Sequence, residues 1–522
     1  MFSTLRDRAL TAAREGIERR LGGYRQAVHH EDATRPTRVE GAAPTVAVIG
    51  GGIAGITAAS TLAERGFSVT LFEKAHYLGG KCGAWEVDID GEKQRVDHGF
   101  HAFFRNYHNL RALLERVGAT RFFAPIDDYM ILRRDRSRIS FREADTAPVF
   151  NLLSLTKVGL YKTRDLLLNP SMRKLDPFLR YDEASTFAAW DHVNYEDFAR
   201  EAALPADLRL VFNTFARAFF SEGDRLSVAA LIRAFHFYYL SNDGGLLYDY
   251  FVDDYERCLA EPARAWLEKH GAKIELNAGV DSFDLGEERG FSMSGRAFDR
   301  VVLACDVKAA RELVTKAPRL GAKHGEFVAR MGKQKRSQRY AILRVWSDRE
   351  VSAGMPVFVI TDKLRALDAV TFTHRVVPEA KAWAERRGGG VYELHSYSVP
   401  DDLADGDVAR VLREEFEHFF PEVKGAKVFG EYLHMRDDFA CFHVGAHADR
   451  ATVDTGVSGL YLAGDWVRIP TPATLMEASC TSGLLAANGI LRESGLREAP
   501  VYSVPRKGLL ANVGVMTTRD AR

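Results

Sequence analysis

The sequence contains little cysteine, no excess of charge of either sign and no long hydrophobic run. Its five cysteines are scattered through 522 residues, without a CxxC pair or a cysteine and histidine spacing that suits a metal. We therefore expect no metal site and no disulfide framework, as in a reduced cytoplasmic protein. Lysine plus arginine equals aspartate plus glutamate, at 71 each, which argues against a nucleic-acid partner.

No stretch approaches the roughly 20 apolar residues that cross a bilayer, and the first residues lack the apolar core of a secretory signal. Hydrophobic residues nevertheless make up 46% of the chain and aromatic residues 11%, which is enough for a large core. At about 150 residues per domain, the length corresponds to about three domain-sized units.

Residues 1–28 are predicted to form one amphipathic helix. Apolar residues recur there at helical spacing, and six arginines accompany three acids. Two interpretations follow: the helix lies on an anionic membrane surface, or it packs on the body of the protein. Residues 29–44 are polar and contain proline, which is typical of a linker.

A βαβ unit follows the linker. Residues 45–49 (TVAVI) are a β-branched run typical of a buried parallel strand, and residues 68–72 predict a second strand after a helix. The first strand runs into the cluster GGGIAG, a GxGxxG motif. Here Gly50 permits a tight turn, Gly52 lets the backbone approach a pyrophosphate, and Gly55 lets the helix pack closely on the strand.

The helix that starts at this motif supports nucleotide binding. Its N-terminus presents free N–H groups and the positive end of the helix dipole to phosphates. Glu73 follows the second strand, 21 residues after Gly52, where a carboxylate can accept both hydroxyls of an unphosphorylated adenosine ribose. The unit predicts a dinucleotide but does not distinguish nicotinamide from flavin.

Two further segments favour a flavin. Residues 78–81 (LGGK) place a second glycine pair and a lysine where they can reach the pyrophosphate. Residues 462–465 (LAGD) form a strand-to-glycine-to-acid turn before a helix, and Asp465 suits a ribityl chain. The N-terminus of that helix would face the electron-poor pyrimidine edge of the flavin. Taken alone, Asp465 is equally well explained as a helix N-cap.

The remaining chain divides between helical and extended segments. Residues 150–270 have a mainly helical pattern, and strand-like segments dominate 271–304 and 340–435. We therefore predict an α/β fold in which a Rossmann-like domain, assembled from discontinuous segments, carries an inserted α+β substrate domain. The expected boundaries are 1–28 for the N-terminal helix, 29–44 for the linker, 45–125, 256–315 and 451–495 for the nucleotide-binding domain, 126–255 and 316–450 for the substrate domain, and 496–522 for a C-terminal tail.

Longer stretches resemble the flavin amine oxidase superfamily, and within it the carotenoid desaturases of plant and cyanobacterial type. The resemblance rests on residues 78–85 (LGGKCGAW), 97–119 (DHGFHAFFRNYHNLRALLERVGA) and 462–491 (LAGDWVRIPTPATLMEASCTSGLLAANGIL). Lys81 follows the double glycine as in the desaturase branch, where the common amine-oxidase pattern has arginine. Residues 215–249 and 504–510 are similar to carotenoid phi-ring synthases of the isorenieratene-synthase type, which also move a methyl group.

The resemblance implies FAD as the cofactor, on an FAD-binding domain of the amine-oxidase and glutathione-reductase type. It implies cofactor contacts at Gly50, Gly52, Ile53, Ala54, Gly55, Glu73, Gly80, Lys81, Gly99, Phe100, His101, Val280, Gly464, Asp465 and Met476. It does not identify the catalytic base: His101, Asp97 and Glu477 are candidates, and each also has a structural interpretation. The aromatic stretch 212–239 is a candidate lining for a polyene tunnel, or else ordinary core.

The implied activity converts a β-ionone ring of a carotenoid into an aromatic ring, by hydride transfer and a methyl shift. The alternatives are a desaturase or isomerase of linear polyenes (phytoene or zeta-carotene type), another oxidase like the flavin amine oxidases, and a flavin-stabilised carotenoid carrier. The implied partners are a hydrophobic polyene, an electron acceptor such as a quinone or oxygen, and a membrane surface contacted peripherally from the cytoplasm.

Overall fold

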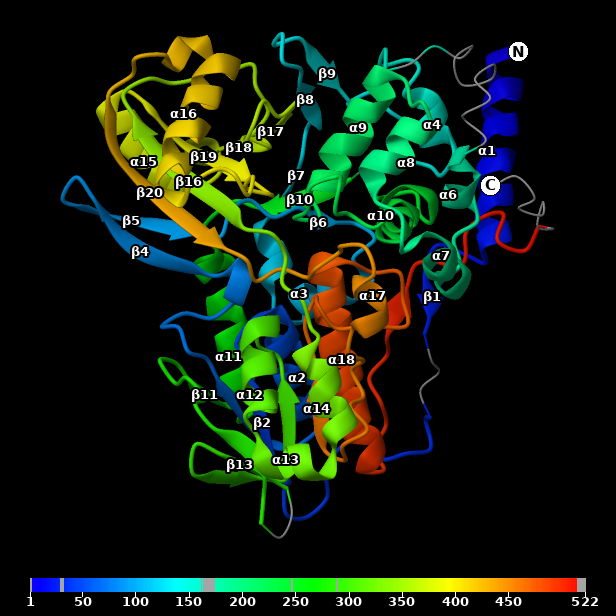
Figure 1. Ribbon diagram of the computed structural model, residues 1–522, viewed down its shortest axis with the longest axis vertical. Helices are drawn as coiled ribbons and strands as arrows, with labels where there is room; N and C mark the ends of the chain where they lie inside the picture. The colour runs from blue at the N-terminus through cyan, green and yellow to red at the C-terminus, as the bar shows by residue number, and fades with distance from the viewer. Residues whose placement is uncertain are drawn as a thin grey trace.

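The computed structural model describes residues 2–28, 32–160, 162, 174–245, 247–287 and 290–513, with the side chains of residues 2–7 excepted. Residues 29–31 of the predicted linker and 514–522 of the predicted tail lie outside the described residues. Figure 1 shows two halves, one above the other. A parallel sheet with helices against it forms the lower half, and a larger sheet beside a group of short helices forms the upper half.

A five-stranded parallel sheet organises the lower half. Its order is β11-β3-β2-β15-β21, and every neighbouring pair is parallel. The strands are short and rich in buried β-branched and leucine residues, as expected where helices cover a parallel sheet. Three separate stretches of the chain supply them, namely β2 (Thr45–Ile49) and β3 (Ser68–Phe72), then β11 (Lys273–Glu275) and β15 (Arg300–Leu303), and finally β21 (Leu460–Leu462).

Close packing between two helices completes this half. α2 (Ile53–Glu64) and α18 (Leu475–Glu493) lie side by side (Figure 1). A Cβ atom at Gly483 would lie 2.4 Å from the Ala54 carbonyl oxygen, so the helices meet at a distance that only glycine permits. Around them lie α3 (His108–Arg116), α11 (Glu261–Lys269), α12 (Val307–Thr315), α13 (Pro318–Lys323) and α14 (Gly325–Gly332), with a small sheet of β12 (Phe283–Leu285), β13 (Phe291–Met293) and β14 (Arg296–Phe298). The hairpin of β4 (Ala84–Ile89) and β5 (Glu92–Asp97) packs against the upper half instead.

A seven-stranded sheet forms one side of the upper half. Its order is β20-β16-β19-β18-β17-β8-β9, antiparallel except between β17 and β8. Its strands are β8 (Met130–Leu132), β9 (Arg138–Ser140), β16 (Tyr340–Ser347), β17 (Phe358–Thr361), β18 (Ala369–Phe372), β19 (Gly390–Ser396) and β20 (Val428–Arg436). α15 (Pro378–Arg387) and α16 (Val408–Phe419) pack against it. Every residue of β16 and β19 is buried, so this sheet has two covered faces.

Short helices form the other side of the upper half. They are α4 (Phe150–Ser154), α6 (Asp176–Leu179), α7 (Glu183–Trp190), α8 (Tyr195–Glu201), α9 (Ala206–Arg217), α10 (Val228–Phe235) with a π-helical turn at His236–Leu240, and α17 (Ala446–Asp449). A three-stranded sheet of β6 (Phe103–Phe104), β10 (Tyr248–Phe251) and β7 (Phe123–Pro125) joins the two halves. Within the described ranges, no helix is both long enough and apolar enough to cross a bilayer.

The N-terminal helix is shorter than predicted. The prediction of a helix over residues 1–28 is wrong for its last turns. α1 covers Phe2–Leu21. It ends because Gly22 and Gly23 take φ values of +78° and +86°, a conformation that terminates a helix. The chain then forms β1 (Gln26–Ala27), which pairs with β22 (Tyr502–Ser503).

A substitution at the contact between α2 and α18 tests this packing. We expect Gly483→Val to lower the free energy of unfolding by about 1–3 kcal/mol, because the new side chain must push α18 away from the Ala54 carbonyl. Gly321→Ala is the control. A Cβ there meets no atom within 4 Å, so it should raise stability by up to about 1 kcal/mol. Thermal unfolding measures both, and a stable Gly483→Val variant would contradict the packing.

Candidate active site

One cavity of about 730 Å³ connects the two halves of the molecule. At its lower end it is lined by residues that lie at or just beyond the carboxyl ends of four parallel strands, namely Ile49, Glu73, Ala304 and Gly464. This edge of an open α/β sheet is where ligands generally bind. The cavity then continues into the upper half, between the seven-stranded sheet and the short helices.

Three glycines of the motif have distinct roles at the lower end. Gly50 has a φ of +110°, and a Cβ there would lie 2.7 Å from the Ala304 carbonyl oxygen. A Cβ at Gly55 would lie 1.9 Å from the Gly50 carbonyl oxygen. Both positions therefore require glycine for the fold. A Cβ at Gly52 would meet no protein atom nearer than 3.8 Å, and Gly52 lines the cavity, so its missing side chain leaves room for a ligand.

Two helices begin at the cavity. Ile53 and Ala54 of α2 line it, as do Leu475 and Met476 of α18. The Thr474 hydroxyl, which could cap α18, instead lies 3.2 Å from the Tyr238 hydroxyl. The amide groups and positive dipole ends of both helices therefore face the same space, which favours an anionic or electron-rich ligand.

Glu73 lines the cavity where β3 ends, and backbone groups hold its carboxylate in place. One oxygen accepts the Gly51 N–H at 2.7 Å and the other accepts the Ala75 N–H at 2.8 Å. Each carboxylate oxygen can accept a second hydrogen bond, so the group remains able to bind ribose hydroxyls. Val280, the predicted adenine contact, lines the same end.

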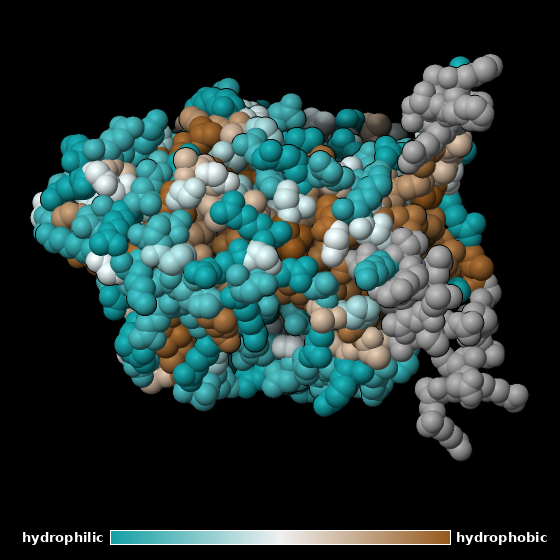
Figure 2. Space-filling model, turned by 90° about the horizontal axis from the view of Figure 1, so that it is seen from above, coloured by the Kyte–Doolittle hydropathy of each residue, from teal (hydrophilic) through white to brown (hydrophobic). Residues whose placement is uncertain are grey.

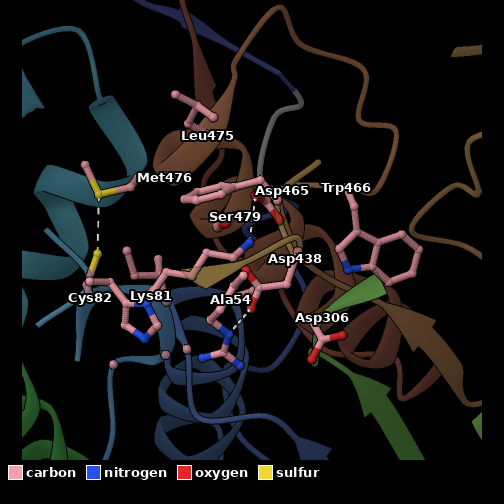
Figure 3. Close-up of a pocket in the computed structure, with 18 of the residues that line it drawn as sticks. Ala54, Lys81, Cys82, Asp306, Asp438, Asp465, Trp466, Leu475, Met476 and Ser479 are labelled. Carbon is pink, nitrogen blue, oxygen red and sulfur yellow. Dashed lines mark hydrogen bonds and ion pairs between the residues drawn. The ribbon is translucent and has the colours of Figure 1, made fainter. Parts of the chain in front are cut away.

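An ion pair spans the middle of the cavity. The Lys81 ammonium lies 3.1 Å from Asp465 and 4.3 Å from the centre of the Phe439 ring, as Figure 3 shows for the Lys81–Asp465 pair. Burial disfavours the ammonium ion, but the Asp465 and Asp438 carboxylates outweigh burial and raise the pKa of Lys81. Gly80, Lys81, Gly464 and Asp465 all line the cavity, so two turns that are nearly 400 residues apart in the sequence meet here.

The segment from Gly99 to His101 forms the wall at the junction of the two halves. His101 Nδ1 lies 2.7 Å from the Gly99 carbonyl oxygen and 3.1 Å from the Tyr255 hydroxyl. Burial lowers the pKa of His101, so its imidazole is neutral near pH 7. Phe100 stacks on Phe358 with ring centres 4.7 Å apart. Phe100 and His101 line the cavity, whereas Gly99 lies behind them.

The other two candidate bases, Asp97 and Glu477, lie outside the cavity lining. Asp97 accepts the Gly99 N–H at 2.8 Å and lies 3.2 Å from Arg344. Glu477 accepts the N–H groups of Asn109 and Leu110, each at 2.9 Å, and so caps the first turn of α3. In both cases the carboxylate contacts hold the backbone in place.

The upper end of the cavity is an aromatic chamber. From the predicted aromatic stretch it includes Thr214, Phe215, Ala218, Phe219, Phe220, Tyr238 and Tyr239. Phe212 and Phe235 of the same stretch instead stack on each other in the core, with ring centres 4.8 Å apart. Sequence reasoning missed the rest of the wall, because several strands and strand ends each supply only one or two residues of it: Tyr129, Tyr248, Ile342, Phe358, Ile360, His395 and Tyr397.

The predicted cofactor residues therefore come together around one space. All of them line the cavity except Gly55 and Gly99, which shape its wall from behind. The glycine-rich end suits a dinucleotide, and the aromatic end suits an apolar substrate held against it. Fold and cavity together define a dinucleotide-binding protein with room for an apolar molecule beside the dinucleotide.

Comparison with known proteins gives the family. A model of the flavin-containing amine oxidoreductases matches residues 53–491, so the chain belongs to this family and is an FAD-dependent oxidoreductase. It is 34% identical to the carotenoid phi-ring synthase of Streptomyces griseus, over 94% of this chain and 96% of that protein. It is 26% identical to the carotenoid phi-ring synthase of Chlorobaculum tepidum, over 89% of this chain and 91% of that protein.

Solved structures confirm the fold. Cyclohexylamine oxidase from Brevibacterium oxydans matches with a TM-score of 0.60 at 15% identity, over 87% of this chain and all of that chain. Putrescine oxidase matches with a TM-score of 0.58 at 14% identity, over 86% of this chain and 99% of that chain. The predicted α/β fold of the amine-oxidase type is therefore correct.

The space at Gly52 gives a direct test of the cofactor site. We expect Gly52→Ala to fold normally, since its φ of −77° suits any residue and the new methyl group comes no closer than 3.8 Å to any protein atom. Its affinity for FAD should fall by about tenfold or more, because the methyl group overpacks the cradle. Flavin absorbance after gel filtration and thermal unfolding of the apoprotein measure the two effects.

Gly50→Ala is the matched variant for this test. It should lose stability even without FAD, because its φ is +110° and its Cβ would contact Ala304. A Gly52→Ala protein that keeps its full flavin content would contradict the assignment of this cradle.

Proposed function

We propose that the protein is a carotenoid oxidoreductase that converts a β-ionone end ring into an aromatic ring with migration of a methyl group. The observation that carries the proposal is an aromatic chamber continuous with the dinucleotide cradle. The chain's similarity to two carotenoid phi-ring synthases, over about nine-tenths or more of its length, supports the same substrate class.

The chemistry explains why such a chamber is needed. Aromatisation removes four hydrogens from the ring and relieves the quaternary carbon that carries two methyl groups. Bound FAD supplies a hydride acceptor for this oxidation. The ring cation that remains would be captured by water as an alcohol, so the site must exclude water until a methyl group has moved and a proton has left. Aromatic side chains such as Phe215, Tyr239 and Phe358 make the wall dry and hold the flat polyene.

In this proposal the chain's own residues divide the work. The glycine loop and Lys81 would hold the pyrophosphate of the cofactor, Glu73 would hold the adenosine ribose, and Asp465 would hold the ribityl chain. Phe100, His101 and Met476 would contact the flavin ring. The two electron pairs removed per ring pass to an acceptor such as a quinone or oxygen.

A second candidate activity is desaturation or isomerisation of a linear polyene. It is favoured by similarity to the zeta-carotene desaturase of Synechocystis sp., which is 25% identical over 52% of this chain and 59% of that protein. The same chamber would hold a linear chain. Oxidation of an amine and a carrier role without turnover are the remaining alternatives.

Pigment analysis tests the proposed activity. In a host that makes β-carotene, the expressed protein should give a pigment lighter by four hydrogens per ring, with aromatic end rings identified by chromatography, mass and NMR. A host that accumulates linear carotenes is the parallel arm. Longer conjugation there, with β-carotene left unchanged, would replace the proposed activity by the second candidate.

Anaerobic titration separates an enzyme from a carrier. Added β-carotene should bleach the flavin absorbance of the purified holoprotein, because the cofactor takes up the electrons. Flavin that stays oxidised while pigment binds would identify a carrier and contradict both enzymatic proposals.

We further propose that the protein binds peripherally to the cytoplasmic surface of the membrane, through the face of the protein that carries α1 and α4. Leu153 on α4 is 46% exposed, and Asn151 on the same helix donates to the carbonyl oxygen of Tyr239, a chamber residue, at 2.6 Å. Helix α4 therefore carries an exposed apolar residue and is also hydrogen-bonded to the chamber wall. Figure 2 shows this end of the molecule, where hydrophobic surface gathers toward the side on which α1 lies.

Packing of α1 is compatible with that contact. Leu21 is buried, and Arg20 donates to the Leu509 carbonyl oxygen at 2.9 Å, so the helix is tied to the body. Most side chains from Arg8 to Arg20 are nevertheless exposed. Basic residues on such a surface contribute about 1 kcal/mol each to binding of anionic lipid.

Removing residues 1–21 tests the membrane contact while leaving the pairing of β1 with β22 intact. The truncated protein should sediment far less with vesicles of anionic phospholipid than the full chain, because it loses five of the six arginines of this region. Zwitterionic vesicles and a flavin spectrum are the controls. Unchanged sedimentation by a truncated protein that still holds FAD would contradict the contact.

A further inference from the structure

A buried cluster of charged residues lies directly behind the chamber wall. Arg344 on β16 contacts the carboxylates of both Glu393 on β19 and Asp97 on β5. The three side chains are at most 8% exposed. Two carboxylates therefore share one guanidinium, and with both ionised the cluster has an unbalanced negative charge.

His395 connects this cluster to the chamber. It lies two residues after Glu393 on β19, so both side chains point to the same face of the sheet. Its Nε2 atom lies 2.8 Å from the Thr371 hydroxyl and 3.5 Å from a Glu393 carboxylate oxygen. His395 lines the chamber, where its ring lies near those of Phe358 and Tyr397.

The second ring nitrogen faces the junction of the two halves. A Cβ atom at Gly99 would lie 3.2 Å from His395 Nδ1 and 3.0 Å from its Cε1. This edge of the ring is therefore next to the Gly99 to His101 segment, of which Phe100 and His101 line the cavity at the junction of the two halves. Burial lowers the pKa of His395 to about 3, so its imidazole is neutral. The tautomer with its proton on Nε2, toward Thr371 and Glu393, leaves the lone pair on Nδ1.

We propose that His395 is the base that takes the proton lost by the rearranged ring cation, and that Glu393 is the positioning residue that stabilises the protonated imidazole. The assignment rests on the proposed aromatising activity. In this step a ring C–H bond breaks, its electron pair becomes a ring double bond, and an N–H bond forms at Nδ1. The proton brings one positive charge to the cluster and balances its extra carboxylate.

His101 fits this role less well. Its Nδ1 atom is directed to the Gly99 carbonyl oxygen, and the Tyr255 hydroxyl is its other neighbour. Both of these partners are neutral. Against the lowering by burial, the Asp97 carboxylate raises the pKa of both imidazoles, but of the two histidines it is His395 whose ring nitrogen lies 3.5 Å from a carboxylate oxygen, that of Glu393.

The cluster also determines the pH dependence. The groups around Glu393 are Arg344, Asp97, His395, Tyr255 and Tyr397. Burial outweighs the attraction of Arg344 and raises the pKa of Glu393 to about 7. Below that pH Glu393 is protonated and no longer offers a negative charge to the protonated imidazole of His395. Formation of the aromatic ring should therefore slow as pH falls through about 7.

Replacement of His395 by glutamine is the first test. The glutamine amide can replace Nε2 toward Thr371, while the base at Nδ1 is lost. At equal flavin content, we expect aromatic product to form at least ~100-fold more slowly, whereas bleaching of the flavin by β-carotene without oxygen continues. The control is His374→Asn, which replaces a buried histidine that contacts the Val391 backbone outside the chamber and should leave the product rate unchanged.

Replacement of Glu393 by glutamine is the second test, and it has a readout other than activity. It should abolish the rate decrease near pH 7. The apoprotein should also change: a carboxyl group whose folded pKa is raised from 4.5 to about 7 makes the protein less stable as pH rises between these values. The wild type should therefore lose thermal stability over this range relative to Glu393→Gln.

The results separate this assignment from the proposed function. A wild type that makes no aromatic ring overturns both. An active wild type together with a His395→Gln variant of similar product rate overturns the role of His395 alone. If His395→Gln does not retain FAD, the Glu393→Gln profile decides, and a rate decrease near pH 7 that survives the substitution overturns the assignment.

Discussion

The structure depends on backbone contacts that leave no room for a side chain. At Gly50 the backbone packs on the backbone of Ala304. At Gly55 the first turn of α2 packs on the Gly50 carbonyl group, and at Gly483 α18 packs on the Ala54 carbonyl group of α2. These contacts hold the ends of β2 and β15 against the start of α2, and hold α18 against the same helix. Without them the helix N-termini would not face a common cavity, and the turns at Lys81 and Asp465 would not meet. The shape of the cofactor site therefore follows from the close packing of these backbone segments.

The sequence specified the lower half of the molecule well and the upper half in outline. The strands over residues 45–49 and 68–72 match β2 and β3 to the residue, because their pattern and the GxGxxG turn are local. Helix α1 was predicted too long, since helical periodicity continued past Gly22. The cofactor residues come from local motifs with fixed spacing or, as for Val280, Met476 and the segment from Gly99 to His101, from the family resemblance. His395 and most of the chamber wall belong to no such motif. Each strand of the buried sheet contributes one or two of these residues, and the pairing of strands that are far apart in the sequence determines which residues face the chamber.

Charge is arranged differently at the two ends of the cavity. Glu73 at the lower end and Lys81 and Asp465 in the middle line the space and can bind polar parts of a ligand. Around the chamber, charged residues lie behind the wall: Lys363 contacts Glu222 at 2.8 Å and Asp368 at 3.6 Å. Buried ion pairs of this kind contribute little net stability because desolvation offsets their attraction. They do hold the wall in one position while keeping its surface apolar.

That arrangement bears on how one site can carry out both oxidation and rearrangement of a hydrocarbon. A ring cation needs surroundings without nucleophiles, yet its last step needs a proton acceptor. A carboxylate at the chamber surface could add to the cation, whereas an imidazole backed by a carboxylate can accept a proton while the charge that stabilises it stays behind the wall. His395 with Glu393 meets both requirements. In the proposed mechanism, the shared side-chain direction of Glu393 and His395 on β19 lets the buried charges determine how the rearranged ring cation loses its proton.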